Sequence, residues 1–340
     1  MPGKVTTTMK VHVKHLDYSG MDHHCILIYR ARQRGSVVKA TFIVFLVVCG
    51  LCRPPFQAHA QTVYVPTFNL NSILQINSAG SVTTFTTASS GLNYPGGLAF
   101  DNSGNLFVAN SGGGNGNSTI QEFTPNGVGT VFATAGLSYP VALAFDSGGN
   151  LFVANDGNNT IEEYTSNGSG TVFATAASGL DYPGDLAFDS SGNLYVPNYN
   201  NTILKFGANG SVSVFATSGL DNPGGLAWSG GNLYVANAGN HTIEKFDSLG
   251  HGSVFTSTNL LSLPIGLAFD SSGNLFVGNH GQSNILKFNQ NGVGSVFASG
   301  LANVAGIAIE DIPEPSALLL AALGVFSLGL FAKRRRLTGT

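Results

Sequence analysis

The residues of this chain that could do chemistry are few, and they stand where a repeated pattern is broken. Asp185 replaces a small residue in the segment at residues 183–186, and its carboxyl group could act as an acid or a base. Asp156, Tyr199 and His280 each directly follow an asparagine that ends a repeated phrase. If the repeat places these positions on one face, they could line a ligand site. With His280 as base and Asp185 as its partner, they could support proton transfer.

Five asparagines occupy one position of the repeat. They are Asn110, Asn155, Asn198, Asn237 and Asn279, and Thr67 stands near the equivalent place in the first copy. Arranged symmetrically, these side chains would form a neutral polar ring, and sugars are bound by such donors and acceptors. An asparagine also readily hydrogen-bonds the backbone of its own turn. The sequence leaves both interpretations open, ligand binding and turn capping.

The sequence favours neither a metal nor a cofactor. Hard divalent cations prefer charged oxygen ligands, whereas the expected ring offers amides. The chain has three cysteines, and all precede residue 61: Cys25, Cys49 and Cys52. Disulfides, thiol catalysis and cysteine-based metal sites are therefore excluded from the remainder of the chain.

No catalytic set stands out among the acidic residues. Four glutamates fall on the third apolar run of a repeat, which we expect to lie away from the axis: Glu122, Glu162, Glu163 and Glu244. The pair of His280 and Asp185 is the only acid–base combination to nominate, and nothing in the sequence shows that the two meet. We expect a non-enzymatic protein without cofactor, and keep a lyase or lactonase as the alternative.

A six-residue phrase supplies the frame that must position these residues. It reads NLFVAN at residues 105–110 and 150–155, NLYVPN at 193–198, NLYVAN at 232–237 and NLFVGN at 274–279. Successive copies start 45, 43, 39 and 42 residues apart, and a diverged copy lies at residues 63–65. A period of this size is close to that of one four-stranded propeller blade. The six copies predict six blades.

Each repeat contains four apolar runs of strand type. The runs are short, rich in Val, Ile, Phe, Tyr and Thr, and bounded by Gly, Asn, Asp or Pro. The chain enters at a second strand, residues 62–65, and leaves after a lone first strand, residues 306–309. Pairing these two ends would close the ring and remove two exposed sheet edges. We therefore predict an all-β, six-bladed β-propeller over residues 61–311.

The first 60 residues have the pattern of an export leader. A 12-residue apolar core at 41–52 follows four basic residues and precedes Ala58-His59-Ala60, a small-x-small cleavage site. A basic region, a short apolar core and such a site are typical of a secretory signal peptide. We expect cleavage after Ala60, with translation starting at Met1 or further downstream, for instance at Met21.

The C-terminal residues 312–340 form a second targeting segment. Pro313-Glu314-Pro315 is followed by sixteen uncharged residues, 317–332, and then by a basic cluster at 333–336. This arrangement resembles the PEP-CTERM sorting signal of Gram-negative bacteria. The resemblance implies a transmembrane helix at 317–332, a cytoplasmic C-terminus, processing by an exosortase, and delivery to the cell surface near exopolysaccharide. An ordinary membrane anchor would give the same topology without processing.

The charge of the predicted domain excludes one class of partner. Residues 61–311 contain fifteen acidic residues against three lysines, a net charge of about −12 with the histidines neutral. A domain this acidic has no patch that could neutralise phosphates, so we expect no nucleic-acid partner.

The repeat itself is similar to the NHL repeat. Residues 231–237, GNLYVAN, followed by 240–246, NHTIEKF, carry the resemblance, together with the Pro-x-Gly segment ahead of them. It implies a six-bladed propeller used as a binding scaffold or, in some relatives, as an enzyme. In that family an aspartate usually ends the second strand, where this chain has asparagine. We expect a surface propeller that binds polysaccharide or another surface protein.

Overall fold

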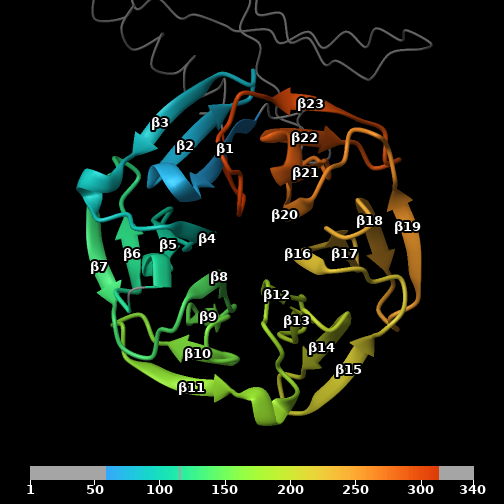
Figure 1. Cartoon of the computed structure of the whole chain (residues 1–340), viewed down its shortest axis with the longest axis horizontal. Helices are drawn as coiled ribbons and strands as arrows, with labels where there is room; N and C mark the ends of the chain where they lie inside the picture. Colours follow the sequence, from blue (N-terminus) through green and yellow to red (C-terminus); the bar gives the residue numbers. More distant parts are fainter. Residues whose placement is uncertain (1–58, 115, 314–340) are drawn as a thin grey trace, which may run out of the picture. The chain divides into compact units, whose positions relative to one another are not determined.

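The fold is a ring of six four-stranded sheets (Figure 1). The computed structural model describes residues 59–114 and 116–313. The predicted leader core at 41–52, the motif residues Glu314 and Pro315, and the predicted helix at 317–332 lie outside them. Within the described ranges, no helix is long and apolar enough to cross a membrane. The predicted all-β, six-bladed propeller is confirmed.

The first three blades follow the chain, except that the last strand belongs to blade 1. Blade 1 contains β24 (Ala308–Pro313), β1 (His59–Thr67), β2 (Ser72–Asn77) and β3 (Val82–Thr86). Blade 2 contains β4 (Pro95–Phe100), β5 (Leu106–Asn110), β6 (Thr119–Phe123) and β7 (Gly129–Ala133). Blade 3 contains β8 (Pro140–Phe145), β9 (Leu151–Asn155), β10 (Thr160–Tyr164) and β11 (Gly170–Ala174).

The remaining blades repeat the pattern, with one shortened strand. Blade 4 contains β12 (Ala187–Phe188), β13 (Leu194–Asn198), β14 (Thr202–Phe206) and β15 (Val212–Ala216). Blade 5 contains β16 (Pro223–Ser229), β17 (Asn232–Asn237), β18 (Thr242–Phe246) and β19 (Gly252–Thr256). Blade 6 contains β20 (Pro264–Phe269), β21 (Leu275–Asn279), β22 (Asn284–Phe288) and β23 (Gly294–Ala298). Short 3-10 turns are η1 (Phe68–Leu70), η2 (Ala88–Ser90), η3 (Gly112–Gly114), η4 (Ala176–Ser178) and η5 (His280–Gln282).

The ring closes in blade 1, as expected from the chain ends. The last strand, β24, runs antiparallel to β1, with Val63 opposite Ile309 and Tyr64 opposite Ala308. A further bond crosses the same junction, because the Tyr64 hydroxyl donates to the Glu310 carboxylate over 2.9 Å. Burial and this carboxylate both raise the pKa of the tyrosine. Closure therefore depends on the two ends of the propeller sequence.

Neighbouring blades interlock through edge-to-face aromatic contacts. The aromatic residue of a second strand packs on a ring from the fourth strand of its own blade and on one from the first strand of the next blade. Phe107 does so with Phe132 and Phe145, each with ring centroids 5.0 Å apart. Trp228 takes the equivalent place against Tyr195, with ring centroids 4.8 Å apart in a tilted arrangement, and so packs between blades 4 and 5. Such ring pairs add specific geometry to the apolar area they bury.

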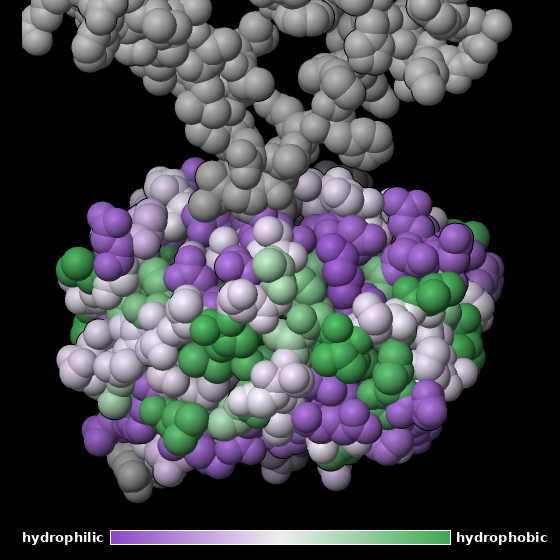
Figure 2. Space-filling model, turned by 90° about the horizontal axis from the view of Figure 1, so that it is seen from above, coloured by the Kyte–Doolittle hydropathy of each residue, from purple (hydrophilic) through white to green (hydrophobic). Residues whose placement is uncertain are grey.

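The outermost strands form the exposed rim of the ring. Side-on, apolar and polar residues alternate over this rim without a continuous apolar surface (Figure 2). At one equivalent position of the outermost strand, five blades expose a valine: Val131, Val172, Val214, Val254 and Val296. The register of every outermost strand also shifts at one point against its neighbour. Such bulges twist an exposed edge and hinder pairing with another chain.

The alternation of antiparallel strands defines two faces. One face carries the hairpins between second and third strands and the crossings from one blade to the next. We call it the asparagine face, because the repeated asparagines end the second strands there. The other face carries the remaining turns. His59 lies opposite Pro313 in the ladder at that other face, so both ends of the propeller leave it there.

The bond between Tyr64 and Glu310 makes a testable contribution to closure. Replacing Tyr64 by Phe removes the hydroxyl and keeps the ring, so we expect a loss of about 1 kcal/mol in urea unfolding. Amide hydrogen exchange of β24 should become faster. In the control, Tyr195→Phe, a hydroxyl bonded to Asp189 within blade 4 is removed instead. Equal exchange of β24 in the two variants would contradict a role in closure.

Candidate functional site

The five repeated asparagines lie below the asparagine face with no exposed surface. Each side-chain oxygen accepts a backbone N–H from the crossing into its own blade, and each side-chain nitrogen donates to a carbonyl of that crossing and to a hydroxyl or amide on the third strand. All these bonds measure between 2.6 and 3.2 Å. Asn237, for example, joins Asp221, Gly219 and Thr242. The asparagines thus cap the backbone of the crossing, 16–19 residues earlier in the chain, and not that of their own turns.

A second set of polar contacts ties each blade to the next on the same face. The residue before the proline of a first strand has a positive φ at Tyr94, Tyr182, Asn222 and Leu263. The backbone N–H of each donates to a side chain of the preceding blade's hairpin: Asn71, Asn159, Asn201 and His241. His241 is thus a hairpin residue whose Nδ1 accepts the Leu263 N–H over 3.0 Å.

The other predicted site residues occupy equivalent places on this face. Asp156, Tyr199 and His280 follow the capping asparagines of blades 3, 4 and 6. The backbone N–H of Asp156 donates to Tyr139, and that of His280 to Leu263, so each residue borders the crossing that enters its blade. Burial raises the pKa of the Asp156 carboxyl group.

His280 and Asp185 are bonded to different partners. The Nδ1 of His280 lies 2.9 Å from the Val304 carbonyl and must donate to it, which leaves Nε2 as the free nitrogen. Asp185 belongs to blade 4 and His280 to blade 6, so blade 5 separates them. The structure brings each to the asparagine-face half of the ring, and no hydrogen bond joins them among the described residues.

Blade 4 departs from the other blades at its innermost strand. The sequence predicts a strand at residues 183–188, whereas β12 contains only Ala187–Phe188. The second strand of this blade carries Pro197, as that of blade 1 carries Pro66, whereas blades 2, 3, 5 and 6 have alanine or glycine at this position. A proline has no N–H to donate to a ladder. The inner segment that faces Pro197 keeps one bond to this strand, from the Gly184 N–H to the Pro197 carbonyl, and the regular ladder begins only at Ala187.

Asp185 lies on this inner segment, at a position where blade 2 has a glycine. At the equivalent position in blade 2, a Cβ on Gly97 would lie 2.6 Å from the Cα of Ala142, because neighbouring inner strands approach closely. In blade 4 the Asp185 carboxylate instead accepts the N–H of Leu226 in β16 over 2.7 Å and that of Leu186 over 2.8 Å. It thus cross-links two inner strands. Burial raises the pKa of this carboxyl group to about 7, against the opposing effect of the two N–H bonds.

An exposed aromatic pair lies directly above this irregular strand. The rings of Tyr182 and Tyr199 meet edge to face with centroids 6.1 Å apart, and their exposed fractions are 54% and 67%. Asn159 of blade 3 holds the backbone of Tyr182, and Asp156 of the same hairpin borders Tyr139. We call Tyr139, Asp156, Tyr182 and Tyr199 the seam patch; the first two lie at the crossing into blade 3 and the last two at the crossing into blade 4.

The sequence prediction missed two members of the seam patch. Tyr139 and Tyr182 both stand directly before the proline that opens a first strand, as Tyr94 does, whereas blades 5 and 6 have Asn222 and Leu263 there. This change of residue type around the ring was the available signal. Tyr94 is less open than Tyr182, because it packs against Phe68 with centroids 4.9 Å apart.

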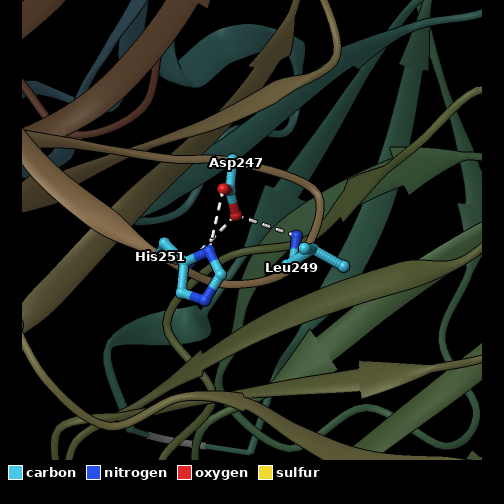
Figure 3. A network of polar contacts seen from close by, with 3 residues as sticks. All are labelled: Asp247, Leu249 and His251. Carbon is cyan, nitrogen blue, oxygen red and sulfur yellow. Dashed lines mark hydrogen bonds and ion pairs between the residues drawn. The ribbon is translucent and has the colours of Figure 1, made fainter.

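Polar groups elsewhere have structural roles. In the turn shown in Figure 3, Asp247 accepts the backbone N–H of Leu249 and of His251 and lies 3.0 Å from the His251 ring. These bonds lower the pKa of Asp247. The His251 side chain is 76% exposed, so the turn is open to solvent. Glu162 and Glu244 are buried on the third strands β10 and β18, where burial raises their pKa.

No metal cluster marks the described part of the chain. No group of three or more His, Cys, Asp or Glu side chains is placed there to hold a metal ion. A shallow polar hollow of about 460 Å³ lies on the face opposite the asparagine face, in blade 4, between Asn193, Lys205 and Ser213. Its lining residues include no carboxylate.

Comparison with known proteins supports the sorting motif and the fold. A family model described as the PEP-CTERM protein-sorting motif matches residues 311–336. This match implies exosortase processing, export and sorting to the bacterial cell surface. No curated protein sequence matches the chain.

Among solved structures, the nidogen/laminin complex contains a chain that is 18% identical, with a TM-score of 0.65, covering 73% of this chain and 98% of that one. Virginiamycin B lyase from Staphylococcus aureus is also 18% identical, with a TM-score of 0.57, covering 73% and 84%. A catalytically inactive variant of that lyase, solved with quinupristin, is 16% identical, with a TM-score of 0.56, covering 75% and 94%. At these identities the likeness is one of fold.

The buried caps predict a structural role that unfolding can test. In Asn237→Ala, the Asp221 N–H and the Gly219 carbonyl lose this partner below the surface, and the Thr242 hydroxyl loses one donor while it keeps its bond to Asn240. We expect a loss of about 2–4 kcal/mol in urea unfolding. The control is Asn240→Ala in the same hairpin, since Asn240 is exposed. A loss no larger than that of the control would contradict the capping role.

The pKa of Asp185 predicts a pH-dependent stability. The folded state binds this proton more tightly than the unfolded chain, so stability should fall as the pH rises from about 4 through 7. Between pH 5 and 8 the loss should be about 2–3 kcal/mol. Asp185→Asn should remove this part of the slope, whereas Asp181→Asn should not. Parallel slopes of wild type and Asp185→Asn in urea unfolding would refute it.

Proposed function

We propose that this protein is a surface-sorted propeller that binds an extracellular polysaccharide through the asparagine face and catalyses no reaction. One observation carries the proposal: the exposed Tyr182–Tyr199 pair on the asparagine face, where the hairpin that carries Asp156 also holds the backbone of Tyr182 through Asn159. The face of a sugar ring presents C–H groups that pack on aromatic rings, and its hydroxyls bond to carboxylates and amides. Tyrosine suits such a surface, because it offers a rigid apolar body and a polar tip.

Charge selects among polysaccharides. The propeller sequence carries a net charge of about −12, and Asp156, Asp181 and Asp221 all belong to the asparagine face. A polymer rich in uronate or sulfate would be repelled, the more so at low salt. We therefore infer that the ligand is a neutral polysaccharide or one with amino sugars.

The position of the chain ends supports the same face. Both ends of the propeller leave at the face opposite the seam patch, and the sorting motif begins within β24, at Asp311. While the C-terminal segment holds the protein at the inner membrane with its end in the cytoplasm, the seam patch points away from that membrane. After processing and delivery to the surface of a Gram-negative cell, the same face is available to the extracellular polymer.

Two other partners remain as alternatives. The nidogen/laminin complex shows that a related fold takes part in a protein complex, so a surface protein could occupy the asparagine face. The fold is also that of virginiamycin B lyase, and His280 presents a free Nε2 on this face. A lyase or lactonase acting at the channel mouth is therefore the enzymatic candidate, with His280 as the base.

Glycan binding tests the proposal. The exported chain should bind neutral or amino-sugar polymers on a glycan array, and Tyr182→Ala or Tyr199→Ala should weaken binding at least about tenfold, as expected when a central aromatic contact is lost. The control is Leu249→Ala, which removes a 75% exposed apolar side chain on the opposite face.

Three results would count against it. Binding to surface proteins alone in a pull-down would favour the protein partner. Turnover of a lactone or uronate substrate that is lost in His280→Ala would favour the enzyme. Glycan binding unchanged in both tyrosine variants would move the site away from the seam patch.

A further inference from the structure

The closing strand of the propeller continues into the sorting motif. The matched motif begins at Asp311, and β24 extends to Pro313, the first proline of Pro-Glu-Pro. In the ladder, Gln61 lies opposite Asp311, Ala60 opposite Ile312 and His59 opposite Pro313. The first three residues of the motif are thus part of the sheet.

Among the strands that the structure describes, β1 alone pairs with this part of the motif. In the strand order of blade 1, β24 is terminal and pairs with β1 alone. The partners of Ile312 and Pro313 are Ala60 and His59, which are the last two residues of the predicted leader. Leader cleavage hydrolyses the Ala60–Gln61 bond: water adds hydroxyl to the Ala60 carbonyl and a proton to the Gln61 amine. Both partners then leave with the leader.

We propose that removal of the leader releases the sorting motif for its processing enzyme. An enzyme that reads a peptide segment commonly binds it extended, through backbone groups that must be free to pair. While His59 and Ala60 remain, Ile312 and Pro313 are held in the ladder next to the scissile region. The N-terminal cleavage therefore precedes C-terminal processing and permits it.

The same cleavage preserves the closure of the ring. It leaves Gln61, Thr62, Val63 and Tyr64 paired with β24. The first residue of the cleaved chain, Gln61, stands opposite Asp311 in register. The released segment thus begins directly after Asp311, and the propeller stays closed while the motif becomes accessible.

Blocking leader cleavage in the full chain tests this order. Ala58→Phe places a bulky residue in the small-x-small site without changing β1, which starts at His59. In cells with the exosortase, we expect the leader-retained protein to lose its C-terminal segment at least about tenfold more slowly than wild type, because two strand pairs must open first. Pulse-chase labelling with intact-mass analysis measures both ends, and Ala58→Glu replaces Ala58→Phe if cleavage persists.

A second variant separates strand pairing from simple tethering by the retained leader. Four residues, Gly-Ser-Gly-Ser, are inserted between Asp311 and Ile312 in the Ala58→Phe background, which moves the motif out of the ladder. We expect processing to return to the wild-type rate with the leader still attached. Wild-type processing of Ala58→Phe alone would overturn the proposal. Slow processing that the insertion does not restore would also overturn it, since the tether and not the ladder would then be responsible.

Discussion

Mutual burial between blades is the constraint on which the rest of this structure depends. Each sheet is apolar on both sides and needs a neighbour on each, so the stack of blades is stable only as a closed ring. The aromatic contacts of Phe107 with Phe132 and Phe145 show how one ring side chain joins two blades. Closure then falls to β1 and β24, the two ends of the repeat sequence. The buried asparagines complete the arrangement, because they satisfy the backbone of the crossings that the packing covers.

Blade 4 departs from the repeat beside the candidate site, because it combines a proline in its second strand, which blade 1 also has at Pro66, with an aspartate in its inner segment. Pro197 withdraws an N–H from the ladder of blade 4, and Asp185 transfers the freed inner segment to β16. Neither substitution alone has an evident compensation. Together they exchange a bond within one blade for a bond between two blades. The exposed Tyr182 stands three residues ahead of Asp185 on the same segment, so local release of β12 and the surface aromatic pair are parts of one feature.

Period and residue type were sufficient to predict the architecture. The repeated phrases at residues 105–110 and 150–155 correspond to β5 and β9, which end at the expected asparagines. The last strand pairs with the first, as the positions of the two unpaired strands in the sequence predicted. The separation of His280 from Asp185 was also implicit, since blades 4 and 6 are not neighbours in a ring of six. The depth of the asparagines was not predictable, because a periodic position gives an angle around the ring and not a distance below the surface. The shortening of β12 was missed because the effect of Pro197 depends on which strand it faces.

The antiparallel exit of both chain ends from one face has a mechanical consequence. When the C-terminal segment is pulled away from that face, the force acts along β24 and therefore parallel to its ladder with β1. Hydrogen bonds loaded in this direction share the force and must break together, whereas a pull across the strand would open them one at a time. The pairs from Gln61 to Tyr64 bear this load in shear. If the propeller is held at a membrane by β24, the pulling force acts on the β1–β24 junction in shear. This is the direction in which the ladder that closes the ring resists force best.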